Sequence, residues 1–440
     1  MVRLFLANSS KLQVTAKTYI KPLPQWFFSK ETKILFKILI SNDAEVRFVG
    51  GCVRDSLLQL PVTDIDIATT DRPEIVTEKL RNEGFKTINV GLSYGTVITI
   101  IAGRRFEVTT LRRDSENFGR QAKVEFINDW VEDANRRDFT INTLSCNSEG
   151  LVFDPFGGID DLRNGQILFV GNPRKRIEED HLRLLRFFRF FAWYGIGLPD
   201  PRALKACSES AQFLNKISGE RLNQETLKLL SAPNPLLALQ SMANIGVLDI
   251  LLPGVTKLNI LEDLLGLESF CRGSLVLDSI CRLAALFRNN HDNISKISEK
   301  LKFSKIQAAR FFRLTLPEPR LKPRYYRKKG DQTFYPFNTE DCLQKILLNW
   351  AEDGGLSSSH SDEWLALFNK AKIWVSPKFP LNGGDVISHG ISSGELVGNL
   401  LRDLENFWIK ESFKPNREDL LLKLEKEIKN LSNQDAENHQ

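Results

Sequence analysis

Two aspartates separated by a single residue, Asp64 and Asp66, are the side chains best placed to do chemistry. Their run is rich in β-branched residues, and the side-chain period of a strand is two. Both carboxylates would therefore leave one face of a strand, while Ile65 and Ile67 would point into the core. Paired carboxylates repel each other unless a cation lies between them, and oxygen ligands of this kind suit Mg²⁺. A strand end exposed to solvent would produce the same spacing without a metal.

A glycine pair upstream, Gly50 and Gly51, follows a short apolar strand and opens a predicted helix that carries Arg54. Glycines let backbone amides approach a phosphate, and the helix N-terminus adds positive potential. Arg54 could then bind a phosphate oxygen. A glycine pair before a helix is also a common turn. Together with metal-binding carboxylates, however, it predicts a site that polarises a nucleoside triphosphate for in-line attack.

The elements that position these residues change character near residue 170. Between residues 46 and 170, short β-branched runs alternate with turns and with predicted helices at 54–60 and 73–82, and the last strand-like run is 166–171. Beyond this point nearly every stretch has the period of a helix, including 178–195. The pattern predicts an α+β chain, in which an α/β domain with one dominant sheet is followed by helical domains. The length of 440 residues favours two or more domains.

Composition limits the class of protein. Hydrophobic residues make up 42% of the chain and charged residues 26%, as in ordinary soluble globular proteins. No apolar run is long enough to span a membrane and the N-terminus lacks a signal-peptide pattern, so we expect a cytoplasmic protein without a membrane partner. The six cysteines show no zinc-site spacing, which favours reduced, structural thiols. The net charge of +5 is a weak indication of an anionic partner.

Four more motifs follow the glycine pair and the carboxylates. They are NRRDFTINTL at 135–144, DPFGGIDDLRNG at 154–165, EDHLR at 179–183 and ISGERLNQETLKLL at 217–230. In this order the motifs resemble those of class II tRNA nucleotidyltransferases and bacterial poly(A) polymerases, within the polymerase β superfamily. The resemblance covers about half of the chain, and residues 379–401 are also similar to the C-terminal end of bacterial members.

The resemblance implies catalysis in an N-terminal head, base selection in a helical neck, and tRNA binding by a helical body and tail. It also implies ATP and CTP as substrates and a two-metal Mg²⁺ site held by Asp64 and Asp66. The predicted ranges are an N-terminal extension at 1–27, the head at 28–170, the neck at 171–275, the body and tail at 276–430, and a flexible C-terminus at 431–440. The implied nucleotide contacts are Gly50, Gly51, Arg54, Arg137, Asp138, Glu179, Asp180, Arg183, Arg186 and Arg189.

An Asp–Arg pair can choose a base by the polarity of its hydrogen bonds. Cytosine and adenine both present a ring-nitrogen acceptor beside an amino donor, so Asp180 would accept from the amino group and Arg183 would donate to the ring nitrogen. Uracil and guanine carry the reversed pattern and would leave both charged groups unpaired. Positions i and i+3 of a helix share a face, which Arg186 and Arg189 would continue, and Glu179 could orient Arg183. A solvated salt-bridge face is the alternative.

Glu107 lies in the strand-like run RRFEVTTLR at 104–112, which could be a neighbouring strand of the carboxylate pair. It could supply a third catalytic carboxylate, or it could form a salt bridge at the strand edge. Poly(A) polymerases more often carry a basic residue at this position, and residues 109–136 resemble the flexible loop of CCA-adding members, although GRQ at 119–121 departs from the usual GRH. We therefore predict CCA addition to tRNA. Poly(A) addition is the second hypothesis, and a catalytically silent RNA-binding relative is the third.

Basic residues gather between residues 300 and 329, where acidic residues are few and Tyr325 and Tyr326 lie among the positive charges. Such a cluster suits backbone phosphates and an occasional stacked base. A solvated loop after Pro317 would explain the same composition. The predicted RNA-binding residues are Lys322, Arg324, Arg327, Lys328 and Lys329.

Overall fold

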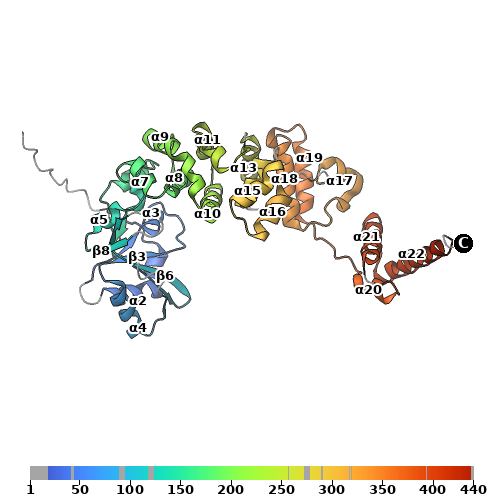
Figure 1. Cartoon of the computed structure of the whole chain (residues 1–440), viewed down its shortest axis with the longest axis horizontal. Coiled ribbons are helices and arrows are strands. Elements are labelled where there is room, and N and C mark those ends of the chain that lie inside the picture. Colours follow the sequence, from blue (N-terminus) through green and yellow to red (C-terminus); the bar gives the residue numbers. More distant parts are fainter. Residues whose placement is uncertain are drawn as a thin grey trace, which may run out of the picture. The chain divides into compact units, whose positions relative to one another are not determined.

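The computed structural model of the chain describes residues 18–40, 44–88, 95–116, 123–255, 257–271, 278–288, 291–316, 318, 320–392 and 394–437. The chain divides into two compact units, Met1–Leu251 and Leu252–Gln440, and the boundary lies inside the stretch that the sequence assigns to the neck. All strands of the described residues lie in the first unit, and helices follow them (Figure 1). The predicted α+β class is confirmed.

The described strands of the first unit form one large mixed sheet with the order β1-β10-β9-β2-β3-β6-β5-β4. Its pairs are antiparallel except for β3 and β6, which run parallel and bring Asp66 opposite Glu107. A separate hairpin is made by β7 and β8. The strands are β1 Thr18–Tyr19, β2 Val46–Val49, β3 Asp66–Thr69, β4 Thr87–Ile88, β5 Thr96–Ile101, β6 Arg104–Thr110, β7 Arg112–Glu116, β8 Lys123–Phe126, β9 Ser145–Cys146 and β10 Leu151–Phe153.

The two faces of the sheet differ. On one face Phe48 packs among the rings of Trp26, Phe27 and Phe36, at centroid distances of 4.2–4.8 Å, under α1 (Gln25–Phe28) and α2 (Lys30–Leu39). Ile67 of β3 pairs with Phe48 and is buried on this face, while α4 (Pro73–Asn82) packs against α2 and against β5 and β6. The opposite face carries a smaller apolar cluster of Val49, Ala68, Leu111, Ile127 and Trp130. Because side chains alternate along a strand, Asp66 belongs to this second face.

Two elements differ from those that the sequence predicts. The helix expected at 54–60 is α3, Gly51–Leu57, which begins earlier because Gly50 has a φ of 69° and ends the strand sharply. The strand expected at 166–171 is wrong, since the described structure has only an isolated bridge there, between Phe139 and Phe169. The apolar side chains of this run serve packing instead. Phe169 stacks on Phe187 of α8, with 5.7 Å between ring centroids, and so joins the sheet domain to the first long helix that follows it.

The rest of the first unit is helical. Its helices after the sheet are α6 Gly158–Arg163, α7 Pro173–Glu179, α8 Leu182–Tyr194, α9 Pro201–Ser210, α10 Gly219–Leu230, α11 Leu236–Asn244 and α12 Val247–Leu251. α5, Trp130–Asn135, precedes β9. α8 and α10 pack against each other along their buried faces, which carry Phe187 and Phe188 on α8 and Leu222 and Leu229 on α10.

In the second unit the buried α18 packs against α13, α16 and α19, while α21 packs against α20 and α22. The described α-helices of this unit are α13 Asn259–Phe270, α14 Ser279–Phe287, α15 Ile294–Lys300, α16 Lys305–Thr315, α17 Pro323–Lys329, α18 Thr339–Glu352, α19 Ser361–Lys372, α20 Gly383–Ser388, α21 Glu395–Lys410 and α22 Arg417–Glu437. α22 is helical as far as Glu437, where the sequence predicts a flexible end, because no glycine or proline interrupts it. Within the described ranges, no helix combines the length and the apolar character needed to cross a membrane.

Candidate active site

A cavity of about 760 Å³ in the first unit collects most of the predicted site residues. Its walls come from the start of β3, from α3, from the segment around Arg137, and from α8 and α10. The predicted residues that line it are Gly50, Gly51, Arg54, Asp66, Arg137, Asp138, Asp180, Arg183, Arg186 and Arg189. Asp64, Glu107 and Glu179 are not among the lining residues, although each lies next to one that is. The cavity thus joins motifs that are far apart in the sequence.

The turn at Gly50 lets the guanidinium of Arg137 approach the backbone closely. The N–H of Gly50 donates to the Leu144 carbonyl at 2.9 Å, so this amide is already satisfied within the protein. A β-carbon added to Gly50 would lie 3.0 Å from Nη1 of Arg137, and the positive φ also favours glycine at this position. Gly50 therefore lets the Arg137 guanidinium reach the entrance of α3.

Arg54 is buried and is held by three neighbours. Its Nε donates to Asp55 at 2.9 Å, Nη1 donates to Asn142 at 2.6 Å, and Nη2 donates to the Tyr194 hydroxyl at 2.8 Å. Tyr194 in turn donates to Asp55, and its ring faces the Arg54 guanidinium at 4.3 Å. Most donors of Arg54 are thus engaged. The residue links α3 to the end of α8 as well as facing the cavity where a phosphate was predicted.

The carboxylates lie at one end of β3. Asp66 is the first residue of the strand and is half-buried, whereas Asp64 precedes the strand and is exposed. Burial raises the pKa of the Asp66 carboxyl, and the negative charge of Glu107 adds to this, while Arg137 opposes it and Asp64 raises it further. A cation held here would relieve that crowding. The carboxylates therefore fit a hydrated Mg²⁺, which takes few protein ligands.

The sequence left two roles open for Glu107, a third catalytic carboxylate and an ion pair at the strand edge. It lies opposite Asp66 in the register of β3 and β6, but its carboxylate also accepts from Nη2 of Arg105 at 2.5 Å. In the part of the chain that the structure describes, no group of three or more His, Cys, Asp or Glu side chains is arranged to hold a metal. The strand-edge ion pair is thus present, and a third-ligand role for Glu107 stays a prediction.

The predicted helix across 178–195 is interrupted at Asp180. α7 ends at Glu179 and α8 begins at Leu182, and Asp180 between them is extended, with φ −150° and ψ 105°. Its Oδ1 accepts the N–H of Leu182 at 3.1 Å, as a capping side chain does at a helix start. Asp180 and Arg183 are therefore not two positions of one helix face. The link between two helices brings them to the same cavity.

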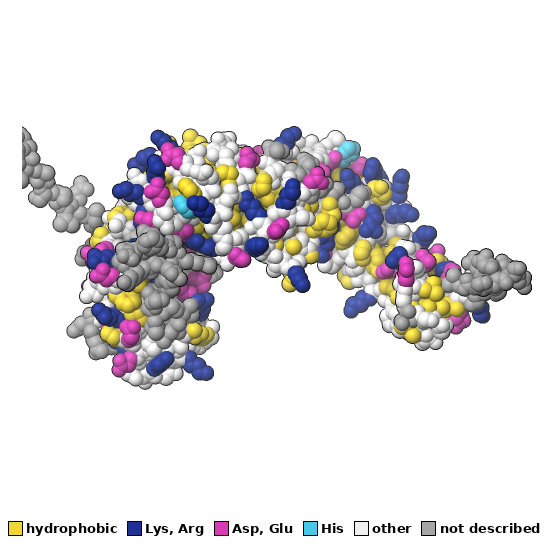
Figure 2. Space-filling view, viewed as in Figure 1, with side chains coloured by type: hydrophobic (Ala, Val, Ile, Leu, Met, Phe, Trp, Pro, Cys, Tyr) yellow, Lys and Arg dark blue, Asp and Glu magenta, His cyan; other side chains and the backbone are white. Residues whose placement is uncertain are grey.

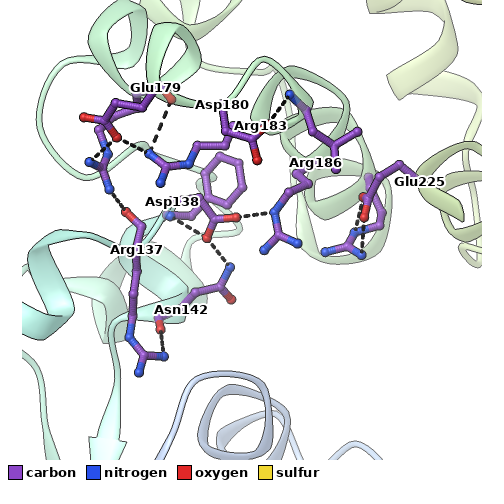
Figure 3. Close-up of polar contacts among 12 residues, drawn as sticks. Arg137, Asp138, Asn142, Glu179, Asp180, Arg183, Arg186 and Glu225 are labelled. Carbon is purple, nitrogen blue, oxygen red and sulfur yellow. Dashed lines mark hydrogen bonds and ion pairs between the residues drawn. The ribbon is translucent and has the colours of Figure 1, made fainter. Parts of the chain in front are cut away.

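Each charged residue of this motif has an opposite charge beside it (Figure 3). Arg183 donates to Glu179 at 2.6 Å, which is the orienting contact that the sequence predicts, and it also reaches the Arg136 carbonyl. The remaining pairs are Asp180 with Arg221 at 2.8 Å, Arg186 with Asp138 at 2.5 Å and Arg189 with Glu225 at 3.3 Å. The cluster is thus internally neutralised, and its side chains are held in place before any nucleotide arrives.

Asp138 lies at the centre of a chain of hydrogen bonds that we call the Arg54–Arg186 relay. Arg54 donates to Asn142, the Asn142 amide donates to Asp138 at 3.0 Å, and Arg186 donates to the other oxygen of Asp138. Burial alone would raise the pKa of Asp138, but the Arg186 guanidinium and the Asn142 bond hold it below its ordinary value. The predicted nucleotide contact at Asp138 is therefore also a buried connection between α3 and α8.

The sequence analysis missed three residues that line the cavity, Asn142, Tyr194 and Arg221, and one that pairs with a lining residue, Glu225. Asn142 lies in a recognised motif but is uncharged, and Tyr194 follows the arginine-rich stretch without a spacing signal. Arg221 and Glu225 stand in the motif at 217–230 and are spaced i and i+4, which places them on one helix face. That spacing could have identified them, because their charges complement Asp180 and Arg189.

The predicted RNA-binding residues lie in the second unit, on and beside α17. None of the α17 side chains is buried, and basic side chains gather over this region in Figure 2. Arg327 pairs with Glu363 at 2.7 Å. Farther upstream the basic stretch is largely neutralised, since Arg310 pairs with Asp278 and Glu340, and Arg313 pairs with Asp341. The basic surface is thus narrower than the sequence alone indicates.

Two segments of the chain match known protein families, and most of its length matches known proteins. Residues 46–168 match the poly A polymerase head domain, and residues 199–258 match the probable RNA and SrmB-binding site of polymerase A. The chain is 32% identical to human CCA tRNA nucleotidyltransferase 1, mitochondrial, over 91% of both chains. It is 30% identical to the CCA-adding enzyme of Ligilactobacillus salivarius, over 86% of this chain and 91% of the other.

A solved structure of a CCA-adding enzyme is also similar to this chain. The crystal structure of Bacillus stearothermophilus CCA-adding enzyme in complex with CTP is 28% identical, with a TM-score of 0.70, and the match covers 92% of this chain and 98% of the other. Of the two branches that the sequence left open, these relatives belong to the CCA-adding one. The chain therefore belongs to the family of class II CCA-adding tRNA nucleotidyltransferases, which shares its head domain with the poly(A) polymerases.

Proposed function

We propose that this chain completes tRNA 3′ ends by adding CMP and AMP from CTP and ATP without a nucleic-acid template. In each step the RNA 3′-hydroxyl attacks the α-phosphate, a new phosphodiester bond forms and pyrophosphate leaves. The observation that carries the proposal is that a single cavity is lined by the carboxylate of Asp66 and by the base-reading candidates Asp180 and Arg183. A reacting phosphate and a base can thus be bound together.

The residues divide the work along the cavity. We assign Asp64 and Asp66 to a divalent metal, which when bound would polarise the α-phosphate and activate the attacking hydroxyl. Gly51, Arg54 and Arg137 would contact the triphosphate or the ribose at the entrance of α3. Asp180 and Arg183 would read the base edge, because a carboxylate accepts from the amino group of cytosine or adenine and a guanidinium donates to the ring nitrogen.

We also assign a role to each of the predicted domains. We assign catalysis to residues 28–170, base selection to 171–275 and tRNA binding to 276–430. The exposed charges of α17 support the last assignment, because three of them, Arg324, Lys328 and Lys329, form no ion pair with an acidic side chain among the described residues. A phosphate-dominated surface of this kind suits the shape of a folded RNA more than its sequence.

The first test is incorporation of labelled CTP and ATP, separately and together, into a tRNA that lacks its last three nucleotides. We expect two CMP additions with CTP alone, and a product that stops at CCA with both nucleotides. A long tail from ATP alone would instead make the chain a poly(A) polymerase. Addition of CC without the final A, or of A only to a tRNA ending in CC, would contradict the complete activity.

Removing charge from α17 should weaken tRNA binding. We expect the triple variant Arg324→Gln, Lys328→Gln, Lys329→Gln to raise the tRNA Kd by roughly tenfold. The slope of log K against log salt should become less negative by about 2–3, because a complex with three fewer phosphate contacts releases fewer counterions when it forms. Filter binding across a salt series measures both. The matched control replaces three exposed lysines of α2, namely Lys30, Lys33 and Lys37, with glutamine. Equal losses of tRNA affinity in both variants would show that α17 is not part of the RNA-binding surface.

The compartment is a separate prediction. The sequence favours the cytoplasm, whereas the human and mouse relatives carry the description mitochondrial. A fluorescent fusion to the C-terminus of the full chain, imaged against a mitochondrial marker, decides between the two.

A further inference from the structure

α10 turns one charged face toward the base-reading residues. Arg221 and Glu225 are one turn apart on this helix, and they contact Asp180 and Arg189 respectively. Figure 3 shows Asp180 and Glu225 on opposite sides of Arg186. Arg221 itself lines the cavity, whereas its helix is anchored away from the cavity by buried residues such as Leu222 and Leu229. A fixed helix thus reaches into a site whose other charges come from α8 and the α7–α8 link.

Asp180 needs such an anchor because it belongs to no helix. Its backbone is extended in the link between α7 and α8, and its side chain is 36% exposed. In the described structure two contacts hold its carboxylate, the Leu182 N–H on Oδ1 and Nη2 of Arg221 on Oδ2. The Leu182 contact leaves the carboxylate free to swing about that bond. Arg221 is the contact that ties it to another element.

We propose that Arg221 is a specificity-determining positioning residue, which fixes the Asp180 carboxylate so that the wrong base cannot displace it. The inference rests on the proposed function, because it concerns how that site rejects UTP. A carboxylate held in place faces O4 of uracil with no proton between them, and this mismatch disfavours the base. A carboxylate that can rotate into solvent escapes the mismatch. Selectivity therefore depends on the restraint as well as on the carboxylate.

This role differs from direct binding of the substrate by Arg221. An arginine that contacted the triphosphate would help CTP and UTP equally, so its loss would raise both KM values by the same factor. A positioning arginine acts on the difference between the two nucleotides. A lysine at the same place can still donate to Oδ2, although it lacks the planar fork of arginine. Partial recovery of selectivity by lysine is therefore a signature of the positioning role.

The test measures kcat/KM for CTP and for UTP with the full chain and a tRNA that lacks its last three nucleotides. The variants are Arg221→Gln and Arg221→Lys. The control is Arg202→Gln, which removes an arginine of α9 that is 75% exposed, pairs with Asp200 and lies outside the cavity. We expect the CTP/UTP ratio to fall about 10- to 100-fold in Arg221→Gln, to recover in part in Arg221→Lys, and to stay unchanged in the control.

Other outcomes separate the possible failures. An unchanged ratio in Arg221→Gln overturns the inference, and so does an equal loss for both nucleotides, which points to direct phosphate contact. If Arg221→Gln does not fold, Arg221→Lys is used for the test. The inference is then overturned if the lysine variant keeps the wild-type CTP/UTP ratio while its KM is raised for both nucleotides. A wild-type chain that adds no CMP to this tRNA refutes the proposed function itself.

Discussion

Replacing Asp66 with asparagine should reduce CMP incorporation by about a thousandfold or more, while CTP still binds. Asparagine keeps the shape of the side chain but removes the charge that would hold the metal. A catalytic metal stabilises the transition state by several kcal/mol, and each 1.36 kcal/mol corresponds to a factor of about ten in rate. Single-turnover incorporation at saturating CTP measures the rate. Fluorescence or calorimetric titration in the absence of tRNA measures nucleotide binding. Asp64→Asn should behave in the same way, although Asp64 is exposed and precedes the strand.

The control for this pair is Asp160→Asn, because the Asp160 side chain is 81% exposed and lies outside the cavity of the candidate active site. It should keep wild-type turnover. Near-normal incorporation by Asp64→Asn or Asp66→Asn would refute the assignment of the metal-binding carboxylates. The same experiment can include Glu107→Gln. A loss as large as that of Asp66→Asn would make Glu107 a third functional carboxylate, and a small loss would leave it as the partner of Arg105.

Asp180→Ala should remove most of the preference for CTP over UTP. The variant loses the acceptor for the amino group of cytosine, so kcat/KM for CTP should fall by about 10²–10³. Uracil has no amino group to offer, and in the wild-type protein its O4 would face the Asp180 carboxylate without a proton between the two oxygens. Its efficiency should therefore change little or rise when the carboxylate is removed. We expect the CTP/UTP ratio to fall by two to three orders of magnitude, which competition with both labelled nucleotides measures directly.

Asp200→Ala is the matched control, because it removes a carboxylate from the turn before α9, outside the cavity. An Asp180→Ala variant that kept the wild-type ratio would show that base choice does not depend on this carboxylate. An equal loss for both nucleotides would show that Asp180 supports the site without reading the base. Either result would also redirect attention to Arg183, whose donors already reach Glu179 and the Arg136 carbonyl.

Features that depend on local geometry were predictable from the sequence. The alternation around Asp66 is a property of any strand, so the burial of Ile65 and Ile67 could be expected, whereas the shared direction of the two carboxylates stays a prediction because Asp64 precedes the strand. The helix at 73–82 has the same bounds in the structure, as its proline start and its periodic apolar residues predict. A domain with one dominant sheet followed by helices was likewise predictable from the change of period near residue 170.

Features that depend on tertiary pairing were not predictable in this way. A continuous helical pattern through Asp180 concealed the break, because periodicity does not register a side chain that caps the next helix. The partners of the motif's charges lie far along the chain, as with Arg186 and Asp138 or Arg189 and Glu225. Counting basic residues between 300 and 329 overestimated the basic surface for the same reason, since the acids that neutralise Arg310 and Arg313 come from elsewhere.

The Arg54–Arg186 relay has a thermodynamic consequence. One end lies at the predicted phosphate turn and the other on α8, beside the proposed base-reading pair, with buried Asn142 and Asp138 between them. Any ligand that shifts Arg54 must change the free energy of the arrangement around Arg186, and the effect is reciprocal by linkage. Pyrophosphate and a cognate base would then not bind independently. A coupling of about 1–3 kcal/mol, typical of such networks, would make the affinity for each depend about 5- to 150-fold on the presence of the other.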